Sequence, residues 1–174
     1  MNQELFSRTI CPPCKEKLLQ QETGLFCHKC GQSYNFVNGM PNFLPANLME
    51  KYNSELKLQD LHEEMDFYQN MYKNLNGLDD GHCVVYGYDE IYDFMKDVPR
   101  GSLLDVGCGA GHHSKDLSTL GYEVTGIDLS VNGLLQAQNV SKAHNQNIDF
   151  VIGDVENLPF EDNSFEIRAS VAFT

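Results

Sequence analysis

Four cysteines near the start of the chain stand in two close pairs that could hold a metal ion. Cys11 pairs with Cys14 and Cys27 with Cys30, and twelve residues separate the pairs. Each Cys-x-x-Cys can wrap a tight turn around an ion, and residues 18–26 predict two short strands and a turn. Two such turns on one β-hairpin complete the tetrahedral sulfur site that structural zinc prefers. With four thiolates bound, the ion would have no open position, so it would stabilise the fold and not catalyse.

Redox-active cysteine pairs or free thiols are the alternatives to a zinc site. The first residues, MNQELFSRTI, lack the basic-then-apolar pattern of a secretory signal, and no run of about 18 apolar residues exists. We therefore expect a cytoplasmic protein without a membrane span, where clustered cysteines are more often metal ligands than disulfides. No thioredoxin-like strand–helix–strand pattern surrounds the pairs, which disfavours redox chemistry. His28 could replace a cysteine as ligand, although four thiolates are already present.

A glycine-rich stretch, LLDVGCGAGHHS, is the second chemical signal and covers residues 103–114. Gly107, Gly109 and Gly111 alternate with other residues, between a predicted strand at 103–106 and a predicted helix at 112–120. Without Cβ atoms a ligand can approach the backbone closely, and the helix N-terminus offers free N–H groups. The loop alone does not exclude a dinucleotide site, because that fold uses the same device.

Three aspartates follow or end predicted strands and should lie at one edge of a parallel sheet. Asp105 precedes the first glycine, where it would repel a pyrophosphate and suit a ligand with a cationic end. Asp128 ends a strand at 122–127 and could accept both ribose hydroxyls of an adenosine. Asp154 follows a strand at 148–152. Each of them taken alone could also be a solvated carboxylate at a strand end.

The pattern D-x-G-x-G-x-G resembles motif I of the class I S-adenosylmethionine (SAM)-dependent methyltransferases. LPFEDNSFEI, residues 158–167, resembles a later stretch of the same family. The resemblance implies that the methionine part of SAM crosses the glycine loop and that the adenine contacts Asp154 and the next N–H. The cofactor residues expected are Asp105, Gly107, Cys108, Gly109, Gly111, Asp128, Leu129, Asp154 and Val155. We expect Cys108 to serve packing, and we name no catalytic residue.

A second resemblance covers about residues 8–45. The stretch GQSYNFVNGMPNFLP follows the cysteines, and Tyr34, Gly39, Met40 and Pro41 stand where a small zinc-ribbon family has an aromatic residue and an apolar turn. That family serves as an activator subunit of tRNA and protein methyltransferases. Similar ribbons also precede methyltransferase domains, including one that methylates a ribosomal-RNA guanine.

We predict an α/β fold: a Rossmann-like SAM-methyltransferase sheet, incomplete at about four strands, preceded by a small zinc ribbon. The expected division is a ribbon at 1–45, a helical connector or lid at 46–100, and the N-terminal half of a methyltransferase domain at 101–174. The connector should contain a helix at about 53–74, whose apolar stripe serves core packing or a mobile lid, and a second at 89–97.

The predicted fourth strand, residues 165–170, contains Arg168, which would be costly if buried unpaired. The family sheet has seven strands and this chain supplies four. If the fourth strand is an edge, Arg168 could reach water, and the edge could pair with another chain. We therefore expect either a homodimer through this strand or a truncated piece of a longer enzyme.

The net charge of −13 is uneven. Residues 1–31 hold four basic and three acidic residues, a net of +1, so the remainder carries −14. An acidic body disfavours nucleic acid, which is bound by neutralising phosphates. We expect SAM-dependent methyl transfer to a small-molecule acceptor. The alternatives are an rRNA or tRNA methyltransferase whose ribbon binds RNA, and a non-catalytic module that binds SAM or activates a partner.

Overall fold

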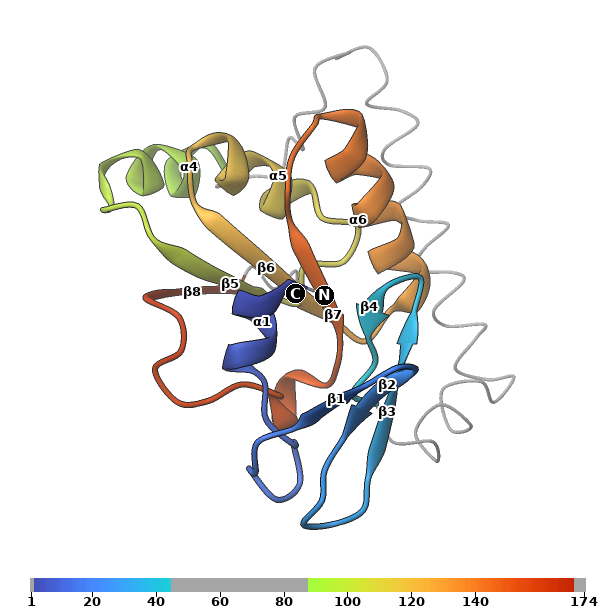
Figure 1. Ribbon diagram of the computed structural model, residues 1–174. Helices are drawn as coiled ribbons and strands as arrows, with labels where there is room; N and C mark the ends of the chain where they lie inside the picture. Colours follow the sequence, from blue (N-terminus) through green and yellow to red (C-terminus); the bar gives the residue numbers. More distant parts are fainter. Residues whose placement is uncertain (1, 45–87, 171–174) are drawn as a thin grey trace.

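The computed structural model describes residues 2–44 and 88–170, and Figure 1 shows their arrangement. The first sheet is antiparallel and consists of β1 (Leu19–Gln21), β2 (Gly24–Phe26), β3 (Ser33–Val37) and β4 (Met40–Pro41). The second is parallel and consists of β5 (Ser102–Val106), β6 (Glu123–Asp128), β7 (Asp149–Ile152) and β8 (Ile167–Ser170). The helices are α1 (Gln3–Arg8), α4 (Tyr88–Asp97), α5 (His112–Thr119), α6 (Val131–Ala143) and the short 3₁₀ helix η1 (Val155–Asn157).

The parallel sheet confirms the predicted α/β architecture and its four strands. Its order is β7-β6-β5-β8, and helices α5 and α6 connect the successive strands β5, β6 and β7. Neighbouring residues of a strand face opposite sides, so Leu103 packs towards α4 and α5 while Leu104 packs on the other face. Both are almost fully buried, as expected for a parallel strand covered on both faces.

Different elements cover the two faces of the parallel sheet. In Figure 1, α4, α5 and α6 lie over one face, while α1 and the antiparallel sheet lie on the opposite side. One hydrophobic cluster unites the N-terminal region with the sheet: Leu5, Cys11, Leu18, Leu25, Cys27, Tyr34 and Phe43 pack with Leu104, Ile127, Val151, Phe160 and Phe165. We call residues 9–44 the ribbon region. It shares a core with the parallel sheet, and the division at residues 45 and 100 stays a prediction.

Backbone hydrogen bonds join the ribbon region to the parallel sheet at two places. The Ile10 N–H donates to the Pro159 carbonyl at 2.9 Å, beside an antiparallel bridge between Thr9 and Phe160. The Phe43 N–H donates to the Ile152 carbonyl at 2.8 Å, which extends the β7 edge. These bonds satisfy backbone groups that would otherwise be buried without partners. The ribbon region is therefore bonded to the residues that flank segment 153–158, which follows β7.

The predicted elements that fall within the described residues are confirmed, with small shifts at their ends. Ser130 caps α6 by accepting a hydrogen bond from the Gly133 N–H. The fourth strand begins at Ile167 and not at 165. The Glu166 carboxylate accepts a hydrogen bond from the Ser102 N–H at 2.8 Å, so this N–H of β5 does not pair with a backbone carbonyl of a longer β8. The helix predicted at 53–74 lies outside the described residues. Within residues 2–44 and 88–170, no helix is long and apolar enough to cross a membrane.

Strand β8 ends the parallel sheet of the described residues. It pairs with β5 on one side, and Arg168 on it is exposed, as the edge prediction required. The cost of burying an unpaired guanidinium therefore does not arise. Pairing of two copies through this strand stays a prediction.

Candidate metal centre and cofactor edge

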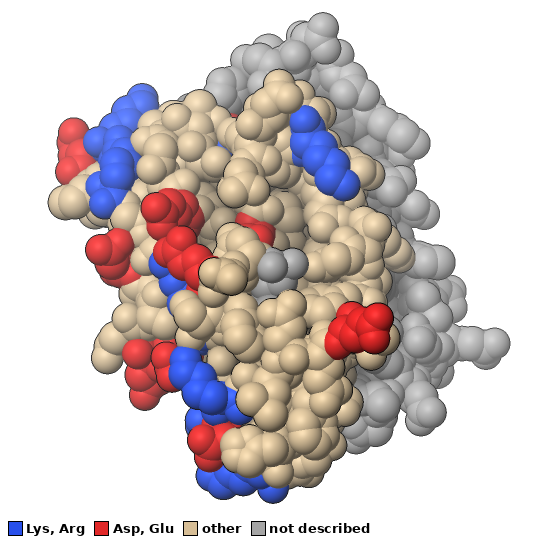
Figure 2. Space-filling model, viewed as in Figure 1, with Lys and Arg blue, Asp and Glu red and all other residues tan. Residues whose placement is uncertain are grey.

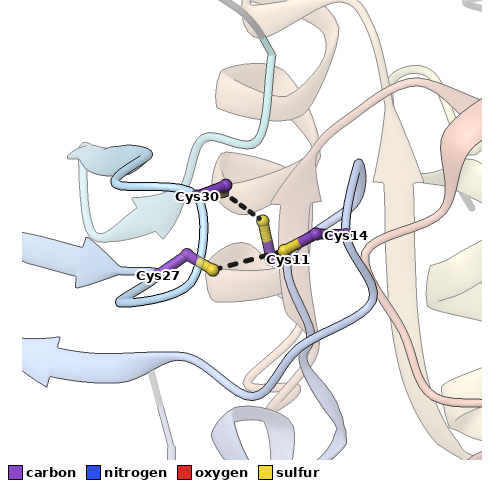
Figure 3. A group of neighbouring side chains, drawn as sticks. All are labelled: Cys11, Cys14, Cys27 and Cys30. Atoms are coloured by element: carbon purple, nitrogen blue, oxygen red, sulfur yellow. Dashed lines mark hydrogen bonds between the residues drawn. The ribbon is translucent and has the colours of Figure 1, made fainter.

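The four predicted cysteines converge on one point of the ribbon region. Figure 3 shows that Cys11 and Cys14 come from one turn and Cys27 and Cys30 from another. The Sγ atoms of Cys11 and Cys30 are 3.5 Å apart, those of Cys14 and Cys27 are 3.4 Å apart, and all four lie within 4.8 Å of one another. Within the described residues, this is the group of donor side chains that could hold a metal ion.

Each pair of cysteines closes a tight turn by a backbone hydrogen bond. The Lys15 N–H donates to the Cys11 carbonyl, and the Gly31 N–H donates to the Cys27 carbonyl, both at 2.8 Å. Lys15 and Gly31 have φ angles of 55° and 73°, in the left-handed region that turns the chain back. Glycine adopts this conformation without strain, as expected for Gly31. The equivalent turns point both cysteine pairs inward.

Burial and hydrogen bonding shift the pKa values of Cys11, Cys14 and Cys27 in different directions. Burial raises the pKa of Cys11 to about 12, while a hydrogen bond from the Cys30 backbone N–H lowers the pKa of Cys27 to about 6. Burial also raises the pKa of Cys14. Without a cation, several thiolates could not coexist here, because their charges would be desolvated together. A divalent metal ion would hold all four deprotonated.

The sulfur positions fit a zinc ion. A zinc–sulfur bond of about 2.3 Å in a tetrahedron implies sulfur–sulfur distances of about 3.8 Å. The two sulfur–sulfur distances of 3.4 and 3.5 Å are slightly shorter than that value, and all four sulfurs lie within 4.8 Å of one another, close enough for one ion to bind them all. Because all four donors are sulfur and two of the residues are fully buried, such a site would be closed and structural.

The glycine loop joins β5 to α5, as predicted, but its three glycines have different surroundings. Gly107, Gly109 and Gly111 all have positive φ angles, of 76°, 51° and 76°. A Cβ on Gly107 or Gly109 would meet nothing within 4 Å, whereas a Cβ on Gly111 would lie 2.6 Å from the Cβ of Ala137 on α6. The first two glycines therefore leave open space before the loop, and the third allows close packing of α5 against α6.

Asp105 lies beneath the loop and not on its surface. Its side chain is 2% exposed, and one carboxylate oxygen accepts a hydrogen bond from the Ser114 hydroxyl at 2.6 Å. Burial raises the pKa of Asp105 to about 6; the hydrogen bond from Ser114 opposes this shift, and the nearby charge of Asp128 adds to it. Direct contact of Asp105 with a ligand stays a prediction.

Asp128 connects the second strand with the glycine loop. Its two carboxylate oxygens accept hydrogen bonds from the Gly109 N–H at 2.8 Å and from the Ser130 N–H at 2.7 Å. The Gly153 N–H, at the end of β7, donates to the Asp128 carbonyl at 3.0 Å. The register of three parallel strands thus brings the glycine loop, Asp128 and the residues around Asp154 to one edge.

The remaining predicted cofactor residues surround this edge. Asp154 caps η1 by accepting a hydrogen bond from the Glu156 N–H, and Val155 is exposed. Cys108 is buried in a hydrophobic cluster that Leu129 also contacts. The Cys108 sulfur lies 2.7 Å from the position that a Cβ on Gly126 would take, and this close packing agrees with the predicted packing role. Burial raises the pKa of Cys108 well above its usual value, so the thiol stays neutral.

Two supporting residues were missed by sequence reasoning. Gly133, in the first turn of α6, lies against the loop, and a Cβ there would be 3.2 Å from the Gly109 carbonyl carbon and oxygen. Ser114 holds Asp105 through its hydroxyl. A glycine in a helix is a signal for close backbone approach, and it could have identified Gly133. No signal in the sequence pairs Ser114 with Asp105, because α5 must first fold over β5.

A known protein family matches the part of the sequence that forms this edge. Residues 103–173 match the methyltransferase domain family. The match starts within β5 and includes the glycine loop and the edge residues Asp128 and Asp154. We call residues 103–173 the methyltransferase segment, and it supports a methyltransferase of the SAM-dependent class.

Curated relatives match the chain over part of their length. Demethylmenaquinone methyltransferase of Renibacterium salmoninarum is 38% identical over 76 residues, which are 44% of this chain and 30% of that protein. Malonyl-[acyl-carrier protein] O-methyltransferase of Buchnera aphidicola is 43% identical over 70 residues, 40% of this chain and 26% of that protein. The chain thus spans less than a third of the length of these relatives. A solved structure from Pyrococcus horikoshii aligns with a TM-score of 0.45 and 32% identity, over 51% of this chain and 44% of that one.

Proposed function

We propose that this chain carries the cofactor-binding part of a SAM-dependent methyltransferase that acts on a small-molecule acceptor in the cytoplasm. A structural zinc ion in the ribbon region belongs to the same proposal. The observation that carries it is the hydrogen bond between Gly109 and Asp128, inside the methyltransferase segment. The two curated relatives are named for demethylmenaquinone and for malonyl-[acyl-carrier protein], which favours an acceptor other than RNA.

The donor groups of the edge suit SAM. Open space before Gly107 and Gly109 would let a ligand approach the loop backbone. A carboxylate has about four acceptor positions, so Asp128 could accept ribose hydroxyls in addition to its two backbone N–H groups. Asp154 and the Val155 N–H would contact the adenine, and the buried charge of Asp105 would favour the cationic end of the ligand.

SAM supplies a sulfonium methyl group when it is bound. The chain's contribution would be binding and orientation, since holding donor and acceptor in line supplies much of the rate. Asp128 would hold the loop through the Gly109 N–H, and the missing side chain of Gly133 would let α6 pack against the Gly109 carbonyl. We assign no catalytic base among the described residues.

An RNA substrate is the less favoured alternative. The lysines of the ribbon region have local partners: Lys17 pairs with Glu161 at 2.9 Å, Lys29 pairs with Glu16 at 3.3 Å, and Lys15 donates to the Leu158 carbonyl at 3.2 Å. On the face shown in Figure 2, basic side chains stand apart or next to acidic ones and do not form one patch. Phosphate neutralisation needs a continuous basic surface.

Calorimetric titration of the zinc-loaded chain with SAM and S-adenosylhomocysteine tests the proposal. We expect micromolar binding, and at least tenfold weaker binding for Gly109→Ala, whose methyl group enters the open space. Gly121→Ala is the matched control, because Gly121 also has a positive φ, 93°, but lies between α5 and β6 at the opposite edge. It should bind as the wild type does.

Two outcomes of this titration would change the proposal. No binding by a folded, zinc-loaded chain would contradict it. Binding without methyl transfer to any acceptor, together with a stable protein partner, would favour the non-catalytic module. Pairing through β8 is a separate question, and light scattering of the same sample would answer it.

A further inference from the structure

A tyrosine lies against the cysteine cluster. Tyr34 belongs to β3 and is 3% exposed, and its hydroxyl oxygen lies 3.1 Å from the Sγ of Cys11, which is fully buried. Among the described side chains, the other hydrogen-bond contacts of the four cysteine sulfurs are with one another. Tyr34 is therefore the side chain from outside the cysteine cluster that contacts a predicted metal ligand.

The Tyr34 hydroxyl can stabilise the negative charge of the metal centre. Four thiolates around one divalent ion carry a net charge of −2, and two of them, Cys11 and Cys27, are buried in the core that the ribbon region shares with the parallel sheet. A buried charge is costly unless hydrogen bonds spread it. Donors to metal ligands orient them and tune the metal, and a phenol O–H is such a donor.

Two contacts hold the ring so that the hydroxyl faces the sulfur. Tyr34 pairs with Leu25 across β2 and β3, which sets its place beside the second cysteine turn. Its ring packs on Phe43 with a centroid distance of 5.0 Å and an interplanar angle of 51°. The Phe43 backbone is bonded to β7. The ring is thus positioned by the fold before any ion binds.

We propose that Tyr34 is a positioning residue of the metal centre. Its O–H donates a hydrogen bond to the Cys11 thiolate, draws charge from that sulfur and slows release of the ion. The proposal rests on the zinc site of the proposed function. It adds a residue that binds no metal itself but determines how firmly the ion is held.

Tyr34→Phe in the full chain tests this role, because it removes the hydroxyl and keeps the ring. The first readout is the sulfur-to-cobalt charge-transfer band of the cobalt(II)-loaded protein. Loss of the hydrogen bond raises the energy of the sulfur lone pairs, so the band should move to lower energy. The second readout is zinc release to a chromophoric chelator, which should be roughly tenfold faster.

Tyr122→Phe is the matched control, because it makes the same change at a buried tyrosine whose hydroxyl donates to the Met95 carbonyl at 2.7 Å and not to a cysteine. The cobalt band should stay in place in this variant. An unchanged band and unchanged zinc release in Tyr34→Phe would overturn the proposal, and so would an equal band shift in Tyr122→Phe. Wild-type protein that binds neither ion through four sulfurs would remove the zinc site itself, and this result is visible before any variant is compared.

Discussion

The cysteine centre and the cofactor edge differ in how their residues are brought together. The four cysteines come from two short turns, each closed by its own backbone hydrogen bond, and their sulfurs face one another. The edge is assembled from β5, β6 and β7, and its carboxylates Asp105 and Asp128 are bonded to other parts of the chain. A closed site can be built from local turns, whereas an open site depends on strand register and on residues that support the loop.

Removal of one cysteine ligand should have the largest effect. Cys27→Ser should lose zinc and lower the unfolding free energy by more than about 4 kcal/mol, since structural zinc contributes folding energy directly. The methyltransferase segment should loosen too, because both regions share one core. Metal analysis and thermal unfolding with hydrogen exchange would measure this. Cys108→Ala, also at a buried cysteine, should keep its zinc. If the β5 and β6 amides of Cys27→Ser keep their wild-type protection from hydrogen exchange, the two regions are stabilised independently of each other.

The buried carboxylate beneath the loop should make stability depend on pH. Because the pKa of Asp105 is raised to about 6, the folded state binds the proton more tightly than the unfolded state. The cost of burial is absent below about pH 4, grows up to about pH 6 and is then constant, at about 3 kcal/mol. Asp105→Asn removes this cost.

Denaturant unfolding of both proteins at pH 4 and pH 7 measures the effect of Asp105. The gain in unfolding free energy of Asp105→Asn over wild type should be larger at pH 7, by about 3 kcal/mol. Asp162→Asn, at an exposed aspartate, should show the same difference at both pH values. A gain from Asp105→Asn that does not depend on pH would contradict the burial argument.

Alanine substitutions at the loop glycines should distinguish a glycine that allows close packing from one that leaves space for the ligand. Gly111→Ala combines a left-handed conformation with a clash against Ala137, so it should cost about 2–3 kcal/mol of stability. Gly107→Ala has the same φ without the clash and should cost about 1 kcal/mol, but it should weaken SAM binding at least tenfold. Chemical unfolding and calorimetric titration measure the two effects. Equal stability losses would mean that the loop glycines are not specialised.

Loss of the polar contact between the ribbon region and α6 should have the smallest effect. The Asn38 amide donates to the Gln138 side chain at 2.6 Å, and Gln138 donates back to the Asn38 carbonyl at 3.3 Å, both at exposed positions. Gln138→Ala should lower the unfolding free energy by less than about 1 kcal/mol. Thermal unfolding with the zinc content held constant measures it. A loss above 2 kcal/mol would show that this contact, and not the shared core, attaches the ribbon region.

The sequence alone determined the local features of both regions. The spacing of Cys11, Cys14, Cys27 and Cys30 already predicts converging thiolates, because a tight turn leaves little freedom between residues three apart. The Asp-Gly pattern around residues 105–111 predicts a strand, a turn and a helix for the same reason. The strand positions followed from short apolar runs. In each case the determining contacts are local: they lie within one turn or one strand–turn–helix unit, or, for the two cysteine pairs, across one short hairpin.

The tertiary structure decided which distant residues meet. Asp105 faces Ser114 and not solvent because α5 folds back over β5, and Asp128 reaches the Gly109 N–H because β6 lies beside β5. The ribbon region shares a core with the parallel sheet through Phe43 and β7. These contacts depend on where the chain reverses and on the register of neighbouring strands. The same local pattern can occur in chains whose strands and helices pack against other elements, so the pattern by itself does not specify these contacts.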